Sequence, residues 1–243
     1  MKTLVSARPE SSLIDTPYSS AHRQMWRELF ARQLALLPAR GCHAAIRATE
    51  ALAPEIEELP CLDRLSAVLN ERIGWRIVPV DGLIEPARMF HLLADRVFAV
   101  SQAMRSVEEM DFAADPDLFH DVFGHLPLLL NPSYRRFLEG LGRRGRRATP
   151  WQQEVLARLM WFSTEVGLVL EGGELRALGG ALLSSRGELS GLERREVAFE
   201  AFDFGAVAST LFQVDSVQDR YYYLDSVESL PHVLRHFDVE MRM

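Results

Sequence analysis

The chain has 243 residues, of which 48% are hydrophobic and 25% are charged, and its formal net charge is −7. These values are typical of a globular protein, and the acidic balance argues against nucleic-acid binding, which usually requires a basic face. No apolar stretch approaches the roughly 20 residues of a membrane-spanning helix. Because the chain has only two cysteines and no recognisable secretory leader, we expect a cytoplasmic protein.

The sequence predicts a short arm followed by one domain. Residues 1–20 lack a continuous apolar run and are expected to form an N-terminal arm. No linker rich in Pro, Gly or Ser divides residues 21–243. We therefore expect these residues to form a single, mainly α domain with a few short β-strands.

Apolar residues recur at helical spacing along most of the chain. In chain order, helices are expected at residues 22–41, 61–74, 86–104 (in part), 132–141, 151–171, 192–202 and 227–237. Gly41 and Gly74 should end the first two of these helices. Short strands are expected at residues 75–84, interrupted by Pro79, and at residues 220–226.

Two histidines stand out in the segment DPDLFHDVFGHLPLLLNP, residues 115–132. The Asp-Pro pair at 115–116 is a favourable helix start, which places His120 and His125 on a helix. Five residues along a regular α-helix leave two side chains about 140° apart. The pair can share a face only if the last turn is widened, as in a π-type turn, and Gly124 marks a place where the helix can distort.

A lone carboxylate lies in the apolar segment MWFSTEVGLVL, residues 160–170. Glu165 is its only charged residue, and burying an unpaired carboxylate costs several kcal/mol. Glu165 must therefore pair with an arginine or bind a cation. Two imidazoles and one carboxylate form the ligand set that leaves open positions on a non-haem iron(II). On residue chemistry alone, the buried salt bridge and the metal site are equal alternatives.

The segments DPDLFHDVFGHLPLL, WFSTEVGL and GGALLSSRGEL together resemble the catalytic domain of the pterin-dependent aromatic amino acid hydroxylases. The similarity runs from about His22 to the final helix. It implies a single catalytic domain of that type, which uses Fe(II), tetrahydrobiopterin or another tetrahydropterin, and dioxygen. The implied reaction is hydroxylation of an aromatic amino acid, with phenylalanine to tyrosine expected first and tryptophan, tyrosine or another aromatic substrate as alternatives.

The resemblance also implies roles for individual residues. The iron ligands would be His120, His125 and Glu165, with Ser184 and Glu188 just behind them. Arg105 would grip the carboxylate of the amino acid through two parallel hydrogen bonds, and the ring pocket would include Phe98, Trp161 and Ser184. The pterin would lie against Gly82, Leu83, Ile84, Met89 and Asp121.

Some positions depart from the family pattern. Met89 stands where relatives place a stacking Phe, although the adjacent Phe90 could substitute. Met160 replaces a common Tyr, Ala113 replaces a small hydroxyl residue, and Asp219 stands where Pro is usual. These changes leave the expected iron ligands intact and fall on the pterin and substrate sides of the site.

Other motifs favour structural explanations. GLGRRG, residues 140–145, matches GxGxxG but follows a helix-like segment, so no dinucleotide loop is expected. The basic run at 143–148 is expected to be a solvated loop. His232 and His236 have a spacing that suits a metal, yet only Asp238 lies near them in sequence, so a solvent-exposed terminal helix is expected.

Two rival functions remain open from the sequence. A zinc-dependent hydrolase could use the same three ligands, and a helical interaction module would keep both histidines as core residues. The chain is too short for a regulatory domain or a long assembly helix beside the catalytic unit, so we expect a monomer.

Overall fold

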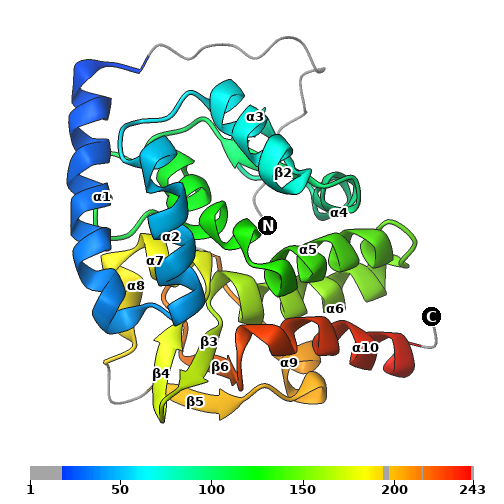
Figure 1. Ribbon diagram of the computed structural model, residues 1–243. Helices are drawn as coiled ribbons and strands as arrows, with labels where there is room; N and C mark the ends of the chain where they lie inside the picture. The colour runs from blue at the N-terminus through cyan, green and yellow to red at the C-terminus, as the bar shows by residue number, and fades with distance from the viewer. Residues whose placement is uncertain (1–17, 194–196, 215, 242–243) are drawn as a thin grey trace.

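The computed structural model describes residues 18–193, 197–214 and 216–241. Most of the arm expected at residues 1–20 therefore lies outside the described residues. The helices are α1 Ser20–Arg40, α2 His43–Ile56, α3 Leu62–Ile73, α4 Pro86–Ala94, α5 Pro132–Gly145, α6 Pro150–Met160, α7 Gly180–Ser184, α8 Arg186–Gly191, α9 Phe204–Ser209 and α10 Leu230–Glu240. Between them lie the π-turns η1 His120–His125 and η3 Trp161–Glu165 and the 3-10 turns η2 Pro127–Leu130 and η4 Val227–Ser229. The predicted mainly α fold class is confirmed (Figure 1).

The strands form two small sheets. Strands β1 Arg76–Val80 and β2 Val97–Ser101 pair in parallel. The second sheet has the order β4-β3-β6-β5, and Figure 1 shows it at the lower edge of the molecule. Its strands are β3 Leu168–Glu171, β4 Glu174–Ala177, β5 Ala198–Ala201 and β6 Arg220–Leu224.

Several predicted elements are confirmed. Helix α1 ends at Gly41, and α3 ends at Gly74, which has φ +70°, a left-handed conformation that glycine adopts without strain. The last helix and the strand before it also form where the sequence placed them. Pro79 does not interrupt β1, because β1 pairs with β2 alone and its other edge needs no backbone donor.

Two predicted helices are wrong in part. The helix expected to continue to residue 171 ends at the π-turn η3, after which Val166 adopts φ −120° and the chain enters β3. Residues 198–201, predicted as helix, form β5 instead, because they pair with β6. Helix α2 was not predicted.

The hydrophobic core surrounds η1. Four side chains in this turn or directly beside it are at most 1% exposed: Phe119, Val122, Phe123 and Leu126. The Phe119 ring stacks on Phe123, with centroids 5.1 Å apart, and meets the edge of Trp26 on α1 at 5.2 Å. Burial of each such side chain stabilises the fold by about 1.5–3 kcal/mol. The segment that carries both histidines is therefore anchored by its apolar neighbours.

The GLGRRG motif lies within α5 and packs helices together. A Cβ on Gly142 would come within 2.2 Å of the backbone of Ala94, and one on Gly145 within 2.2 Å of the Phe90 ring. These glycines let α4 lie directly against α5. The expected absence of a dinucleotide loop at this motif agrees with its helical conformation.

The basic run 143–148 was wrongly expected to be a loop. Its first three residues belong to the last turn of α5. Arg144 pairs with Asp238 on α10, and Arg146 pairs with Asp95 at 3.0 Å. The run therefore joins helices as well as facing solvent.

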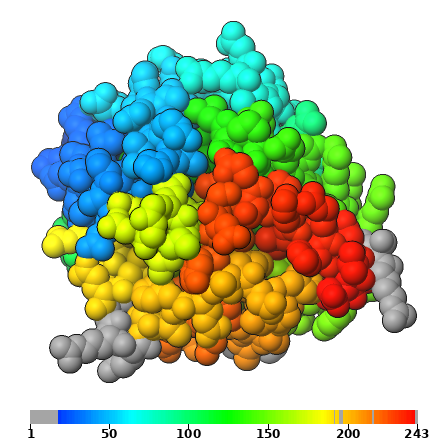
Figure 2. All heavy atoms as spheres, turned by 60° about the horizontal axis from the view of Figure 1, so that its bottom comes forward, coloured from blue at the N-terminus to red at the C-terminus, as the bar shows by residue number. Residues whose placement is uncertain are grey.

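The C-terminal helix lies on the surface. α10 packs against α5 and α9, and Figure 2 shows it in red at the surface. His232 and His236 are exposed on it, as expected, and the nearby Asp238 is engaged by Arg144. No described helix is long and apolar enough to cross a membrane.

Candidate active site

His120 and His125 converge because η1 is a π-helix. The Leu126 N–H donates to the Asp121 carbonyl oxygen five residues back, at 3.2 Å. This wider turn brings residues five apart onto one face. The two Nε2 atoms lie 3.0 Å apart, so the predicted widening of the turn is confirmed.

The start of this segment differs from the prediction. Asp117, and not Asp115, caps it: Asp117 Oδ1 accepts the His120 backbone N–H at 2.9 Å. The same carboxylate is buried against the Arg105 guanidinium, with Nη2 to Oδ1 2.7 Å. This ion pair fixes Asp117 where it can cap the turn, whereas Asp115 lies farther out and lines the pocket.

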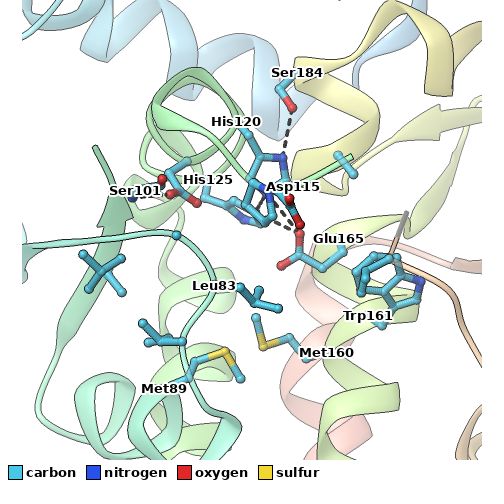
Figure 3. Close-up of a pocket in the computed structure, with 18 of the residues that line it drawn as sticks. Leu83, Met89, Ser101, Asp115, His120, His125, Met160, Trp161, Glu165 and Ser184 are labelled. Carbon is cyan, nitrogen blue, oxygen red and sulfur yellow. Dashed lines mark hydrogen bonds and ion pairs between the residues drawn. The ribbon is translucent and has the colours of Figure 1, made fainter. Parts of the chain in front are cut away.

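Glu165 reaches the histidines from a second π-turn, η3. Here the Val166 N–H donates to the Trp161 carbonyl oxygen at 2.9 Å. Glu165 Oε2 lies 3.4 Å from His120 Nε2 and 3.1 Å from His125 Nε2. Figure 3 shows the three side chains pointing toward one another, two from η1 and one from η3.

A pair of glycines at the start of α7 holds the two π-turns together. A Cβ on Gly179 would lie 2.1 Å from the Glu165 carbonyl oxygen, and a Cβ on Gly180 would lie 2.4 Å from His125 Nε2. From the η1 side, a Cβ on Gly124 would lie 2.5 Å from the Gly180 carbonyl oxygen. Only backbone fits at this junction, so the glycines set how closely the ligand-bearing turns approach.

The other ring nitrogens of both histidines have partners. His120 Nδ1 lies 3.2 Å from Ser184 Oγ, as Figure 3 marks, and the Ser184 hydroxyl donates to the Gly180 carbonyl oxygen at 2.7 Å. His125 Nδ1 lies 2.9 Å from Tyr134 Oη. Ser184 was expected behind the ligands, whereas Tyr134 was not. Glu188, expected there too, accepts a hydrogen bond from Tyr221 at 3.0 Å.

Burial and neighbouring charges shift the pKa values of several side chains in the cluster. Burial raises the pKa of Glu165, but the His125 and His120 side chains outweigh it and hold the pKa of this carboxyl well below its usual range. Burial lowers the pKa of His120, yet the hydrogen bond to Glu165 and its charge produce a net rise. Burial raises the pKa of Asp121 to about 6, although its Oδ2 accepts the Ser101 N–H at 2.7 Å.

The donor atoms fit a single metal ion. Nitrogen and oxygen ligands bind such ions at about 2.0–2.2 Å, so two ligands at right angles lie roughly 3.0 Å apart. The observed separations of 3.0, 3.1 and 3.4 Å are close to this value. Asp121 and the two histidines also offer donor atoms within 4.8 Å of one another. Asp121, however, is already held by a backbone N–H.

A pocket of about 360 Å³ opens at this cluster. The structure brings every sequence-predicted site residue to its wall: Gly82, Leu83, Ile84, Met89, Phe98, Arg105, His120, Asp121, His125, Trp161, Glu165, Ser184 and Glu188. Leu83, Met89 and Met160 lie along one side, and Trp161 lies beside Glu165 (Figure 3). The Trp161 ring stacks on the Phe212 ring, with centroids 4.6 Å apart. Phe212 also lines the pocket, and the sequence did not indicate it.

One detail of the expected pocket is wrong, and the role of Arg105 stays a prediction. Phe90 cannot substitute for Met89, because it is fully buried against α5 and lies outside the pocket wall. Three of the five Arg105 N–H groups have partners: Nε and Nη2 pair with Asp117 at 2.9 and 2.7 Å, and Nη1 donates to the Ser184 carbonyl oxygen at 3.3 Å. One hydrogen on Nη1 and one on Nη2 are left for a substrate carboxylate, so the two parallel hydrogen bonds expected of Arg105 stay a prediction.

Fold and site together define a helical protein with a two-histidine, one-carboxylate cluster at the end of an apolar pocket. The family described as biopterin-dependent aromatic amino acid hydroxylase matches residues 5–243. The chain is 36% identical to phenylalanine-4-hydroxylase of Vibrio cholerae, over 94% of this chain and 79% of that protein. It is 35% identical to the Pseudomonas aeruginosa enzyme, over 88% of this chain and 81% of that protein. The chain belongs to this family.

Solved structures agree with this assignment. The apo cold-active phenylalanine hydroxylase of Colwellia psychrerythraea matches with a TM-score of 0.87 and 36% identity, over 96% of this chain and 91% of that one. Phenylalanine hydroxylase of Chromobacterium violaceum with bound iron(III) and 7,8-dihydrobiopterin matches with a TM-score of 0.84 and 33% identity, over 93% and 84%. The resemblance seen in the sequence is confirmed.

Proposed function

We propose that the protein is an iron(II)- and tetrahydropterin-dependent monooxygenase that hydroxylates L-phenylalanine to L-tyrosine. The observation that carries the proposal is the convergence of His120, His125 and Glu165 at the end of an apolar pocket, in a chain of this family. When bound, iron and the reduced pterin would activate dioxygen, so that one oxygen atom enters the aromatic ring and the other leaves on the hydroxylated pterin. The relatives cited above are named for phenylalanine, which favours it over tryptophan or tyrosine.

His120 Nε2, His125 Nε2 and Glu165 Oε2 would hold the iron. Glu165 is favoured over Asp121 because its Oε2 lies within 3.4 Å of both Nε2 atoms and its pKa keeps it ionised. Three ligands on one side of an ion leave its other positions free, as in non-haem iron oxygenases. Ser184 positions His120 by accepting its Nδ1–H.

Arg105 would bind the carboxylate of the substrate through the remaining hydrogens of its Nη1 and Nη2 groups. Asp117 holds the guanidinium in place, so these hydrogen bonds and the positive charge orient the amino acid. The apolar side chains of Phe98 and Trp161 would contact the aromatic ring and exclude water from it.

The reduced pterin would lie along the wall formed by residues 82–84 and Met89, with Asp121 at its end. The flexible, polarisable thioethers of Met89 and Met160 can pack against a flat ring without the fixed geometry of an aromatic stack. We propose this wall as the cofactor side of the pocket.

The domain organisation, the location, the oligomeric state and the absence of nucleic-acid binding are also proposals. Residues 21–243 would form one domain, since one cluster of buried residues extends from α1 to α10. A cytoplasmic location is supported by Cys42 and Cys61, which are free thiols. A monomeric state and the absence of nucleic-acid binding remain predictions from the sequence.

The test is product analysis. Purified protein with Fe(II), a tetrahydropterin and air is supplied separately with phenylalanine, tyrosine and tryptophan, and the products are identified by mass spectrometry. We expect tyrosine from phenylalanine and no product when iron or pterin is omitted. Conversion of tryptophan alone would overturn the substrate assignment. Absence of pterin-dependent oxygen uptake, with zinc retained, would instead favour the hydrolase.

A further inference from the structure

The hydrogen bond between Tyr134 and His125 joins α5 to the candidate metal centre. Tyr134 Oη lies 2.9 Å from His125 Nδ1, and the tyrosine is 0% exposed. Burial of this kind excludes bulk water as a substitute partner for either atom. The contact links two segments whose hydrogen-bonding residues are nine positions apart in sequence.

The start of α5 places this phenol. Asn131 caps the helix, with its Oδ1 accepting the backbone N–H groups of Ser133 and Tyr134 at 2.8 and 3.1 Å. Pro132 occupies the first turn of the helix, where its fixed φ favours the helical conformation. The backbone that carries Tyr134 is therefore held in place independently of the histidine.

The hydrogen bond bears on which His125 nitrogen can bind a metal. Nε2 points at Glu165 Oε2, 3.1 Å away, and at His120 Nε2. A neutral imidazole binds a metal through the nitrogen that carries no proton, so a metal at Nε2 requires the proton on Nδ1. The Nδ1–H then needs an acceptor, and Tyr134 Oη is the atom at hydrogen-bond distance.

The two histidines are supported in different ways. At His120, Ser184 Oγ gives its own proton to the Gly180 carbonyl oxygen and can therefore only accept from Nδ1. At His125, the acceptor is a bulky phenol on a separate helix, which fixes the plane of the ring as well as its tautomer.

We infer that Tyr134 is a positioning residue that keeps His125 in the metal-binding tautomer and orientation by accepting its Nδ1–H. This inference rests on the proposed function, since it assumes that His125 Nε2 is a ligand. Loss of the acceptor would leave a buried N–H unpaired in the metal-bound state, or return the proton to Nε2, where it competes with the metal.

The experiment measures metal affinity, without turnover. Apo-protein is titrated with Co(II), and the Kd is read from the visible ligand-field spectrum for the unsubstituted protein, Tyr134→Phe and Tyr222→Phe. Tyr222 is the matched control, because it is 1% exposed and its hydroxyl pairs with Thr210 at 2.8 Å, outside the pocket wall. We expect Tyr134→Phe to raise the Kd about 10–100-fold, and Tyr222→Phe to leave it unchanged.

The possible outcomes test the role of Tyr134 separately from the proposed metal site. An equal Kd for Tyr134→Phe and the unsubstituted protein, or an equal loss in Tyr222→Phe, would overturn the role of Tyr134. Failure of the unsubstituted protein to bind Co(II) would overturn the proposed metal site itself. If Tyr134→Phe does not fold, the unsubstituted protein is labelled with ¹⁵N-histidine, loaded with Zn(II) and examined by NMR to find which His125 nitrogen carries the proton. A protonated Nδ1 on His125 with cross-peaks to the Tyr134 ring supports the inference, and its absence overturns it.

Discussion

Gly180 lies directly against the imidazole of His125. A Cβ built on this glycine would fall 2.4 Å from Nε2 and 2.5 Å from Cε1, well inside van der Waals contact. Gly180 is also the residue whose carbonyl oxygen approaches Gly124 on the same π-turn. The position of His125 is therefore set by the absence of a side chain on α7.

We expect Gly180→Ala to weaken metal binding. The added methyl must push His125 away from Glu165, so the Co(II) Kd should rise at least tenfold. Gly205→Ala on α9 is the control, because a Cβ there meets only Asp203 Oδ1 at 3.4 Å, and alanine favours helix by about 1 kcal/mol. A Co(II) Kd unchanged in Gly180→Ala would mean that the ring can move without losing the ion.

The buried Arg105–Asp117 pair predicts two separable effects. Removal of either partner leaves an uncompensated buried charge, so Arg105→Ala and Asp117→Asn should each lower the free energy of unfolding by about 3–5 kcal/mol. Only Arg105→Ala removes the group that faces the substrate carboxylate. The KM of Arg105→Ala for phenylalanine should therefore be well above that of Asp117→Asn. Denaturant titration measures the loss of stability, and steady-state kinetics measures the KM. Equal KM values in the two variants would remove Arg105 from the substrate site.

Met89 and Phe90 should differ in their effects on the pterin. Met89 lines the pocket, whereas Phe90 packs beneath α5. Met89→Ala should raise the KM for the tetrahydropterin with little loss of stability. Phe90→Ala should cost about 3–5 kcal/mol of stability and leave that KM unchanged. The reverse pattern, observed by kinetics and thermal unfolding, would place the pterin elsewhere.

The two cysteines should differ in thiol reactivity. Burial raises the pKa of Cys42 to about 12, whereas Cys61 is exposed. At pH 8 the thiolate, which is the reactive form, is scarce at Cys42. A chromogenic disulfide reagent should therefore label one thiol per native chain and two in denaturant. Rapid labelling of both thiols in the native protein would show that Cys42 is accessible.

The iron-ligand candidates were visible in the sequence because their chemistry conflicts with their surroundings. Glu165 in an apolar segment required an arginine or a cation as partner, and the resemblance to the family joined it to the two histidines; the structure brings the three within 3.4 Å of one another. Tyr134 gave no such signal, since a tyrosine at a helix start is ordinary and its partner lies on another segment. The choice between Asp115 and Asp117 as cap depended on Arg105, which no local pattern reveals.

The fold was predictable where local signals decide the structure. Gly74 ends α3 through its own backbone freedom, as expected. The sequence AFEA of β5 contains good helix formers, and it becomes a strand only because β6 lies beside it. The end of the helix at Val166 has a local signal that was missed: a Cβ on Gly167 would lie 2.0 Å from the Ser163 carbonyl oxygen, so the chain needs a glycine there.

The most direct test is an anaerobic crystal soaked in ferrous salt, with data collected at the iron absorption edge. We expect one anomalous peak at about 2.0–2.2 Å from His120 Nε2, His125 Nε2 and Glu165 Oε2. A peak bound through Asp121 in place of Glu165, or no peak among these side chains, would contradict the proposed metal site.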